Sequence, residues 1–236
     1  MKQKFSLLQS CETCALRGKS VICDLSDDDL AAFQKVKYSF YYEPRRTVFY
    51  EGHSCLGLYL VCSGKVKLTR SSPRGQRQIT GILSAGHLIE THGFRAGAVH
   101  EATCETMESS QICLIEKASY LALVRRDPQV MLRLIQLLSE ELGRSMDQLD
   151  RFRFQSARER LAGLLLELGD RFGQQAGDGL HVGISLKREE LAELAGVTVE
   201  TVIRLLRAFR SEGLVCLDGR AITLLNPERL SRIARR

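Results

Sequence analysis

Two short amphipathic segments joined by a glycine, followed by a hairpin signal, restrict the fold of this 236-residue chain more than any other feature. Residues 186–194 have the apolar spacing of a short helix that stops at Gly196, and Thr198 is a good N-cap for a second helix. Two helices joined by a tight glycine-containing turn are the signature of a helix-turn-helix. Beyond the second helix, two β-rich runs flank Asp218-Gly219, which is a hairpin signal. The segment therefore predicts a helix-turn-helix followed by a β-wing.

The second of these helices carries the side chains that can contact DNA. In a helix-turn-helix it lies in the major groove, with its first turns against the base edges. If residues 199–209 form this helix, Arg204 can donate two hydrogen bonds to guanine and Glu200 can accept one from cytosine. The alternative is a surface ion pair between these two, which are spaced i and i+4 and would gain only about 0.3–0.5 kcal/mol. The candidate DNA-contacting residues are Val199, Glu200, Ile203, Arg204 and Arg207.

Short β-rich runs separated by glycines fill residues 38–125. Aromatic and β-branched residues recur between these glycines, which is typical of a small antiparallel barrel or roll. We expect tight turns, with no need for ligand contacts, at Gly52, Gly64, Gly75 and Gly86.

A long helix is predicted to begin at Asp127 and to run to Phe154. Its apolar residues are spaced alternately by four and three, which is the spacing of a coiled-coil seam. Such a stripe is either ordinary core or a dimer interface, and the length of this helix and the charge on its other faces favour a homodimer. The seam residues are Met131, Ile135, Leu138, Leu142, Ser145, Leu149 and Phe152.

Composition limits the compartment and the chemistry of the cysteines. No apolar run approaches the roughly 18 residues needed to cross a bilayer, and the N-terminal MKQKFSLLQS lacks the apolar core of a secretory signal. We therefore expect a cytoplasmic protein with no membrane partner. In a reducing cytosol the 8 cysteines are poor candidates for disulfides, so the cluster of Cys11, Cys14 and Cys23 predicts a metal-binding or redox-active site.

The charge and the motifs favour a binding protein over an enzyme. A net charge of +6 permits nucleic-acid binding. The sequence contains no nucleophile elbow, phosphate loop or paired histidine ligands, which are the patterns that would indicate catalysis.

Four segments together resemble the Crp/Fnr superfamily of transcription regulators, and most closely its Fnr branch. They are EGHSCLGLYLVCSGKVK and GQRQITGILSAGHLI in the predicted roll, ARERLAGLL after the long helix, and GVTVETVIRLLRAFRSEG around the predicted recognition helix. The last is the most specific, because Val-Glu-Thr-x-x-Arg is the Fnr form of this segment.

The resemblance implies an α+β fold. Its parts would be an N-terminal antiparallel β-roll of the cyclic-nucleotide-binding, jelly-roll kind, a long dimerisation helix and a C-terminal winged helix-turn-helix. We expect a cysteine-rich arm at 1–30, the roll at 31–125, the helix at 126–155 and the DNA-binding domain at 156–236.

The same resemblance implies the partners. A homodimer would bind double-stranded DNA at an inverted repeat similar to TTGAT…ATCAA, with Glu200 and Arg204 reading its G·C pair. Fnr carries serine at the position of Ile203, so the preference for the outer thymine can differ here. RNA polymerase is a further implied partner, but Gln76 and Arg77 stand where Fnr has acidic residues that touch it, which leaves activation and repression both open.

Fnr proteins hold an oxygen-labile 4Fe-4S cluster on three N-terminal cysteines and one cysteine of the roll. The four ligands that the resemblance implies here are Cys11, Cys14, Cys23 and Cys113. Oxygen is the expected signal and nitric oxide its competitor. Eight residues precede the third cysteine, where better-known members have five or seven, but a loop absorbs such a difference at little entropic cost.

Three alternatives to this cluster stand beside it. They are a structural zinc on the same thiolates, a thiol-only redox switch, and a constitutive DNA-binding dimer. Cys104 is the rival fourth ligand. The thiols outside the ligand set are expected to be small buried apolar residues, and they are Cys55, Cys62, Cys104 and Cys216.

Two departures from the family concern the signal. The Crp branch binds cyclic AMP through a Gly-Glu pair and, ten residues on, an Arg-Ser pair whose arginine holds the phosphate. Here Ile89-Glu90 and His100-Glu101 take those places, so no cyclic-nucleotide binding is expected. Ser145 replaces an aspartate that keeps cluster-free Fnr monomeric, so we expect a tighter and less switchable dimer.

Overall fold

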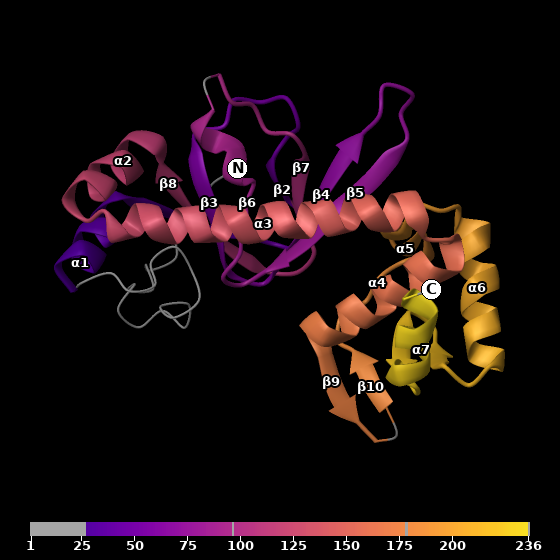
Figure 1. Ribbon diagram of the computed structural model, residues 1–236. Coiled ribbons are helices and arrows are strands. Elements are labelled where there is room, and N and C mark those ends of the chain that lie inside the picture. Colours follow the sequence, from indigo (N-terminus) through magenta and orange to yellow (C-terminus); the bar gives the residue numbers. More distant parts are fainter. Residues whose placement is uncertain (1–26, 96, 178, 236) are drawn as a thin grey trace. The chain divides into compact units, whose positions relative to one another are not determined.

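The computed structural model describes residues 27–95, 97–177 and 179–235, and the chain divides into two compact units, Met1–Gly143 and Arg144–Arg236. The predicted α+β fold is confirmed, with a β-rich first unit, a long helix and a helix-turn-helix in the second unit (Figure 1). Three of the four predicted cluster ligands, Cys11, Cys14 and Cys23, lie outside the described residues.

Two four-stranded antiparallel sheets form the roll of the first unit. One sheet has the strand order β1-β8-β3-β6 and the other β2-β7-β4-β5. Their strands are β1 (Lys37–Tyr42), β2 (Thr47–Phe49), β3 (Gly57–Ser63), β4 (Lys65–Ser71), β5 (Arg77–Ser84), β6 (Leu88–Ile89), β7 (Thr103–Thr106) and β8 (Ser110–Glu116). The 3-10 helix η2 (Thr91–Phe94) follows β6.

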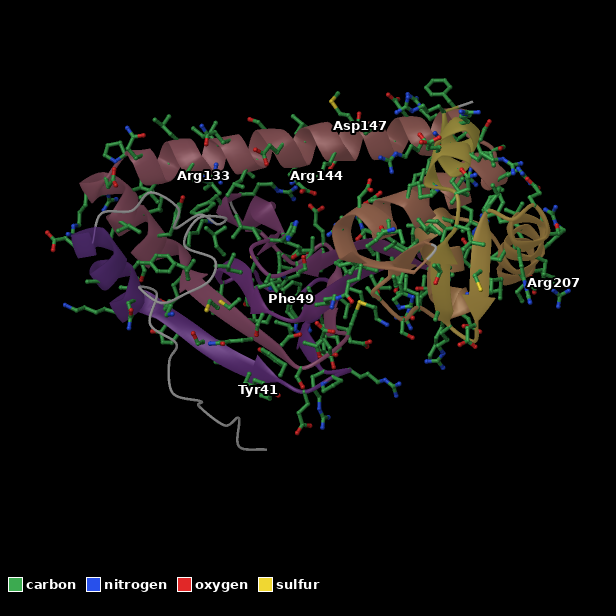
Figure 2. The ribbon with its side chains drawn as sticks, turned by 90° about the horizontal axis from the view of Figure 1, so that it is seen from below. Tyr41, Phe49, Arg133, Arg144, Asp147 and Arg207 are labelled. Atoms are coloured by element: carbon green, nitrogen blue, oxygen red, sulfur yellow. The ribbon has the colours of Figure 1, made fainter. Side chains whose placement is uncertain are left out.

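The interior of the roll is filled by side chains from both sheets. Successive residues of a strand point to opposite faces, so one half of each strand's residues lines the interior. Phe49 lies inside, and Tyr41 lies on the outside (Figure 2). The buried interior cluster is Phe49, Tyr59, Val61, Val66, Ile89, Cys104, Ile112 and Leu114.

A second buried cluster, the helix-side cluster, covers the outer face of the β1-β8-β3-β6 sheet. It joins that sheet to α1 (Asp27–Val36), α2 (Lys117–Arg126) and the start of α3 (Gln129–Phe154). Its buried members are Phe33, Leu58, Ile115, Tyr120, Leu123, Val130 and Leu134. Helices α1 and α2 were not predicted from the sequence: each is only 10 residues long, and α2 has no side-chain cap.

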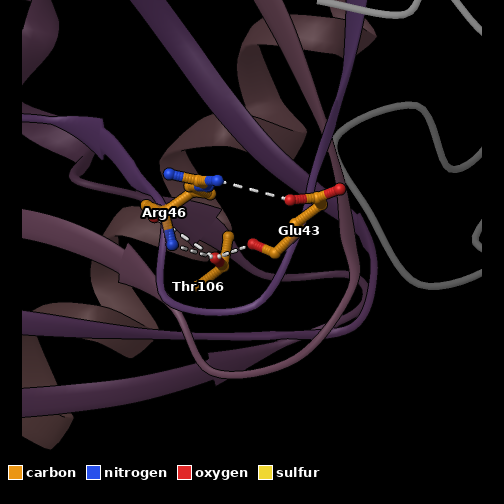
Figure 3. Close-up of polar contacts among 3 residues, drawn as sticks. All are labelled: Glu43, Arg46 and Thr106. Carbon is orange, nitrogen blue, oxygen red and sulfur yellow. Dashed lines mark hydrogen bonds and ion pairs between the residues drawn. The ribbon is translucent and has the colours of Figure 1, made fainter.

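Turns close the roll where the sequence predicted them. All four predicted turn glycines have positive φ, between 76° and 95°. Between β1 and β2, Arg45 also has a positive φ of 62°, and the turn is held by buried Thr106. The Thr106 hydroxyl donates to the carbonyl of Glu43 (2.6 Å) and accepts from the amide of Arg46 (2.9 Å) (Figure 3).

The second unit contains the predicted winged helix-turn-helix. Its elements after α3 are α4 (Ala157–Phe172), β9 (Gly173–Ala176), β10 (Gly179–Val182), α5 (Arg188–Ala195), α6 (Val199–Ser211), β11 (Val215–Asp218), β12 (Ala221–Leu224) and α7 (Pro227–Ala234). The β11–β12 hairpin is the predicted wing, and it pairs with β10 in a sheet of order β11-β12-β10-β9. The β9–β10 hairpin was predicted only as a glycine-rich connection, and α7 was not predicted.

Among the described helices, none combines the length and the apolar character needed to cross a membrane.

Candidate functional site

Helix α6 presents the predicted DNA-contacting residues on one exposed face. Thr198 caps the helix by accepting a hydrogen bond from the amide of Thr201 (3.2 Å). Buried Val202, Leu205, Leu206 and Phe209 hold the opposite face against the unit. The predicted contact residues divide into an exposed and a half-buried set. The first is Glu200, Arg204 and Arg207, and the second is Val199 and Ile203.

The charged side chains on this face are exposed to solvent. Within the parts of the chain that the structure describes, no ion pair joins Glu200 to Arg204, so the predicted alternative of a surface pair is not formed. The pKa of Glu200 lies below its ordinary value, because its own backbone amide and the Thr198 hydroxyl donate to the carboxylate. Arg207 projects from the outer side of the helix (Figure 2).

The turn before α6 is fixed by Gly196, Phe152 and Arg160, of which Arg160 was not predicted from the sequence. Gly196 has a φ of 62°, and a Cβ built there would lie 2.5 Å from Cε1 of Phe152. Arg160 donates from Nε to the carbonyl of Ala195 (2.9 Å) and from Nη1 to that of Gln155 (2.7 Å). The structure thus places Phe152, predicted for the dimer seam, against the helix-turn-helix turn. No local pattern signals this contact, because helices α4 and α5 separate its two partners along the chain.

The predicted seam of α3 is only partly an exposed stripe. Ile135, Leu142 and Leu149 are 50%, 63% and 63% exposed. Leu138, in contrast, is partly buried and packs against the helix-side cluster. Ser145 is exposed, Met131 is half-buried, and two further exposed apolar residues, missed in the sequence analysis, are Leu132 and Met146.

Cys113 lies on the outer face of its sheet. Its neighbours Ile112 and Leu114 belong to the interior cluster, so strand alternation points Cys113 the other way, beside Ile115 of the helix-side cluster. Ser39 is its cross-strand partner on β1, and the Ser39 Oγ lies 3.2 Å from the Cys113 Sγ. The thiol is 2% exposed.

The surroundings of Cys113 favour its thiolate. A hydrogen bond from the Cys62 side chain lowers the pKa of Cys113 most, burial opposes this, and Ser39 and the nearby Lys37 lower it further, to about 6. A sulfur that is ionised at neutral pH is suited to bind a metal, since the thiolate is the ligand form.

The other roll thiols differ from this one. Cys104 is fully buried in the interior cluster, and burial raises its pKa far above the ordinary value. It therefore faces away from the outer face where Cys113 lies. The prediction that the non-ligand cysteines are buried is confirmed for Cys104 and wrong for Cys216, which is exposed on the wing strand β11; Cys55 and Cys62 are half-buried. Side-chain direction on these short strands depends on register, which the sequence does not show.

No group of three or more His, Cys, Asp or Glu side chains forms a metal site within residues 27–95, 97–177 and 179–235. The proposed ligand set therefore has one member, Cys113, in the described part of the chain.

Glu90 and His100 occupy the roll positions compared above with nucleotide-binding residues. Glu90 has a positive φ of 52°, and its carboxylate accepts from the amide of Ala102 (2.7 Å) and lies 2.6 Å from His100 Nδ1. The His100 ring stacks on Phe49 at a centroid distance of 3.6 Å. Glu101 is paired with Arg95 at 3.0 Å, so its charge is partly balanced. Both Glu90 oxygens are thus engaged within the roll.

Comparison with known proteins identifies both units. The family model for a Crp-like helix-turn-helix domain matches residues 159–233, and that for a cyclic nucleotide-binding domain matches residues 39–127. The cyclic AMP receptor protein of Thermus thermophilus is 33% identical over 82% of this chain and 86% of its own. The fumarate and nitrate reduction regulatory protein of Escherichia coli is 26% identical over 95% and 90%. The structure of FixK2 from Bradyrhizobium japonicum matches with a TM-score of 0.73 and 26% identity, over 84% of this chain and 97% of that one.

Proposed function

The chain belongs to the Crp/Fnr family of DNA-binding transcription regulators, on its Fnr-like branch, and we propose that it is a homodimeric sensor of oxygen or nitric oxide. Cys11, Cys14, Cys23 and Cys113 would hold a 4Fe-4S cluster that governs operator binding. The observation that carries this proposal is the position of Cys113, a buried thiol on the outer face of the roll whose surroundings favour the thiolate.

The residues present fit such a group. Four thiolates are the ordinary ligand set of a 4Fe-4S cluster, and Cys113 offers one on a rigid strand. Cys104, the rival ligand, points into the roll interior and has a raised pKa, which disfavours the thiolate. When bound, the cluster would supply an oxidant-labile link between the N-terminal segment and the roll. Zinc accepts the same four ligands but gives no redox response.

The residues of α6 would read the operator. Arg204 and Glu200 are exposed and unpaired with each other, so the arginine is able to donate to a guanine and the carboxylate to accept from a cytosine. An inverted repeat similar to TTGAT…ATCAA would require two copies of this helix, about 34 Å apart in adjacent turns of the groove. The exposed apolar stripe of α3 supports a second copy of the chain as the dimer partner.

The roll interior supports a signal other than a cyclic nucleotide. Glu90 is bonded to His100 and Ala102, and His100 is packed on Phe49. A nucleotide would have to break these contacts, and His100 stands in the sequence where the Crp branch has its phosphate-binding arginine.

Anaerobic reconstitution with iron and sulfide tests the proposal. We expect a brown protein with about four iron and four sulfide per chain. Cys113→Ser should lose most of the iron, while Cys216→Ser, an exposed thiol on the wing, should retain it. A colourless wild-type protein that binds one zinc per chain would refute the cluster.

Operator binding before and after exposure to air tests the switch. The reconstituted wild type should change its operator affinity on exposure, and Cys113→Ser should not. An affinity that air leaves unchanged in iron-loaded wild type would leave a constitutive DNA-binding dimer as the function.

A further inference from the structure

Cys113 has a second thiol beside it that the proposed ligand set does not use. Cys62 stands in an irregularity of β3, between the cross-strand pairs Val61–Ile112 and Ser63–Gln111. Its Sγ lies 3.8 Å from the carbonyl oxygen of Leu60, and its side chain is the largest cause that lowers the pKa of Cys113. It is half-buried, whereas Cys113 is 2% exposed, so a small solute in water meets Cys62 first.

We propose that Cys62 and Cys113 of the cluster-free chain are a dithiol that hydrogen peroxide closes to an intrachain disulfide between β3 and β8. The disulfide itself does not depend on the proposed function. Its consequence does rest on that function: a chain with this disulfide lacks a cluster ligand until it is reduced.

The strand register permits the bond. Leu60 is the direct partner of Cys113 across the β3–β8 ladder, which makes Cys62 a diagonal neighbour. Diagonal Cα atoms in such a ladder are about 7–8 Å apart, and a disulfide needs at most about 6.8 Å. The ladder is interrupted between Val61 and Ser63, and a strand bends most easily where its pairing is broken. A shift of about 1 Å in the Cα separation at this point would bring the pair within the range that a disulfide spans.

The chemistry needs only peroxide as the co-reactant. The O–O bond of hydrogen peroxide breaks as one oxygen atom passes to the Cys62 sulfur, which leaves a sulfenic acid and one water. The Cys113 thiolate then attacks the Cys62 sulfur, the S–O bond breaks, and the departing hydroxide takes up a proton from solvent and leaves as a second water. Two thiols thus lose two hydrogen atoms, and the peroxide is reduced to two waters.

Other roll thiols cannot replace Cys62. Cys104 points into the interior cluster, on the other side of the sheet that carries Cys113. Cys55 lies before β3, outside the ladder that pairs with the strand of Cys113, and it donates to the carbonyl of Gly57 (3.3 Å). Cys55 is therefore the matched control, a half-buried thiol of the same unit.

Peptide mapping of the full-length, metal-free chain after graded hydrogen peroxide tests the proposal. We expect fragments containing Cys62 and Cys113 to be linked, with the loss of two hydrogen atoms, in the wild type and in Cys55→Ala. In Cys62→Ala the link should be absent and Cys113 should remain a thiol or pass to sulfinic acid. Cys62→Ser serves the same purpose should the alanine variant fail to give the wild-type circular dichroism spectrum.

Two results would contradict the proposed disulfide: linkage of Cys113 to any other cysteine in the wild type, or oxidation of Cys62 to sulfinic acid with Cys113 still a free thiol.

Iron loading separates this proposal from the proposed function. After peroxide, dithiothreitol should restore iron uptake to the wild type, while the fraction of Cys62→Ala chains that carries sulfinic acid at Cys113 should not recover. If the wild type never takes up iron, the proposed cluster is refuted. The peptide map then tests the disulfide on its own.

Discussion

Cys113 owes its chemistry to its neighbours across the sheet. Ser39 stands opposite it on β1, and Cys62 lies diagonally from it on β3. The cysteine itself could be singled out from the sequence by the family resemblance. Its partners could not, because they are set by the register of strands that are far apart in the chain, and one of them lies at an irregularity. The same register decides that Cys104 faces inward.

The thiolate of Cys113 should titrate near pH 6 in cluster-free protein. Because this pKa lies below the value of about 8.5 for an unfolded thiol, the thiolate's contribution to the free energy of unfolding is complete above about pH 8.5 and is lost as the pH falls through 6. The difference in ultraviolet thiolate absorbance between wild type and Cys113→Ser measures the midpoint. Cys62→Ala should raise it most and Ser39→Ala less, and unchanged midpoints would contradict this account.

A helix or strand could be predicted from the sequence where residues at its own ends mark its start or stop. Helix α6 and the wing could be predicted because Thr198, Gly196 and the Asp218-Gly219 pair mark their ends in the sequence itself. Helix α2 directly continues the last strand of the roll and has no cap signal, so it was missed. The long helix was predicted, but which of its apolar residues face the core depends on tertiary packing, as Leu138 and Phe152 show.

Gly196→Ala should destabilise the second unit for two reasons. A side chain at a φ of 62° costs about 1–2 kcal/mol, and the new methyl would collide with Phe152. Gly213→Ala is the control, because Gly213 has a similar φ of 70° with no atom near the added Cβ. We expect Gly196→Ala to lower the free energy of unfolding by about 1–3 kcal/mol more than the control, as measured by denaturant unfolding.

A double-mutant cycle separates the collision from the backbone strain. In a Phe152→Ala background the extra loss from Gly196→Ala should shrink to that of the control. Equal losses for both glycine variants in the wild-type background would show that Phe152 does not hold the turn.

For the whole molecule, the stripe of apolar side chains on α3 is unfavourable as long as it is exposed to water. Ile135, Leu142, Met146 and Leu149 are each at least half exposed in the single chain. A contiguous apolar stripe of this kind is a protein–protein contact site, and a symmetric dimer would place the same stripe of two chains against each other. Ser145 lies next to this stripe, and a hydroxyl there is far cheaper to bury than a carboxylate. We therefore expect the dimer to persist when the cluster is lost.

Leu142→Glu should weaken the dimer, because each chain would bring a carboxylate into the contact without a partner charge. We expect the dimer dissociation constant to rise by at least about tenfold, equivalent to about 1.4 kcal/mol, in sedimentation equilibrium. Gln136→Glu adds the same charge to an exposed position beside the stripe and should leave the constant unchanged. Operator affinity should fall with the dimer, because one helix α6 reaches only one half-site. A Leu142→Glu chain that stays dimeric would place the contact between protomers elsewhere on the molecule.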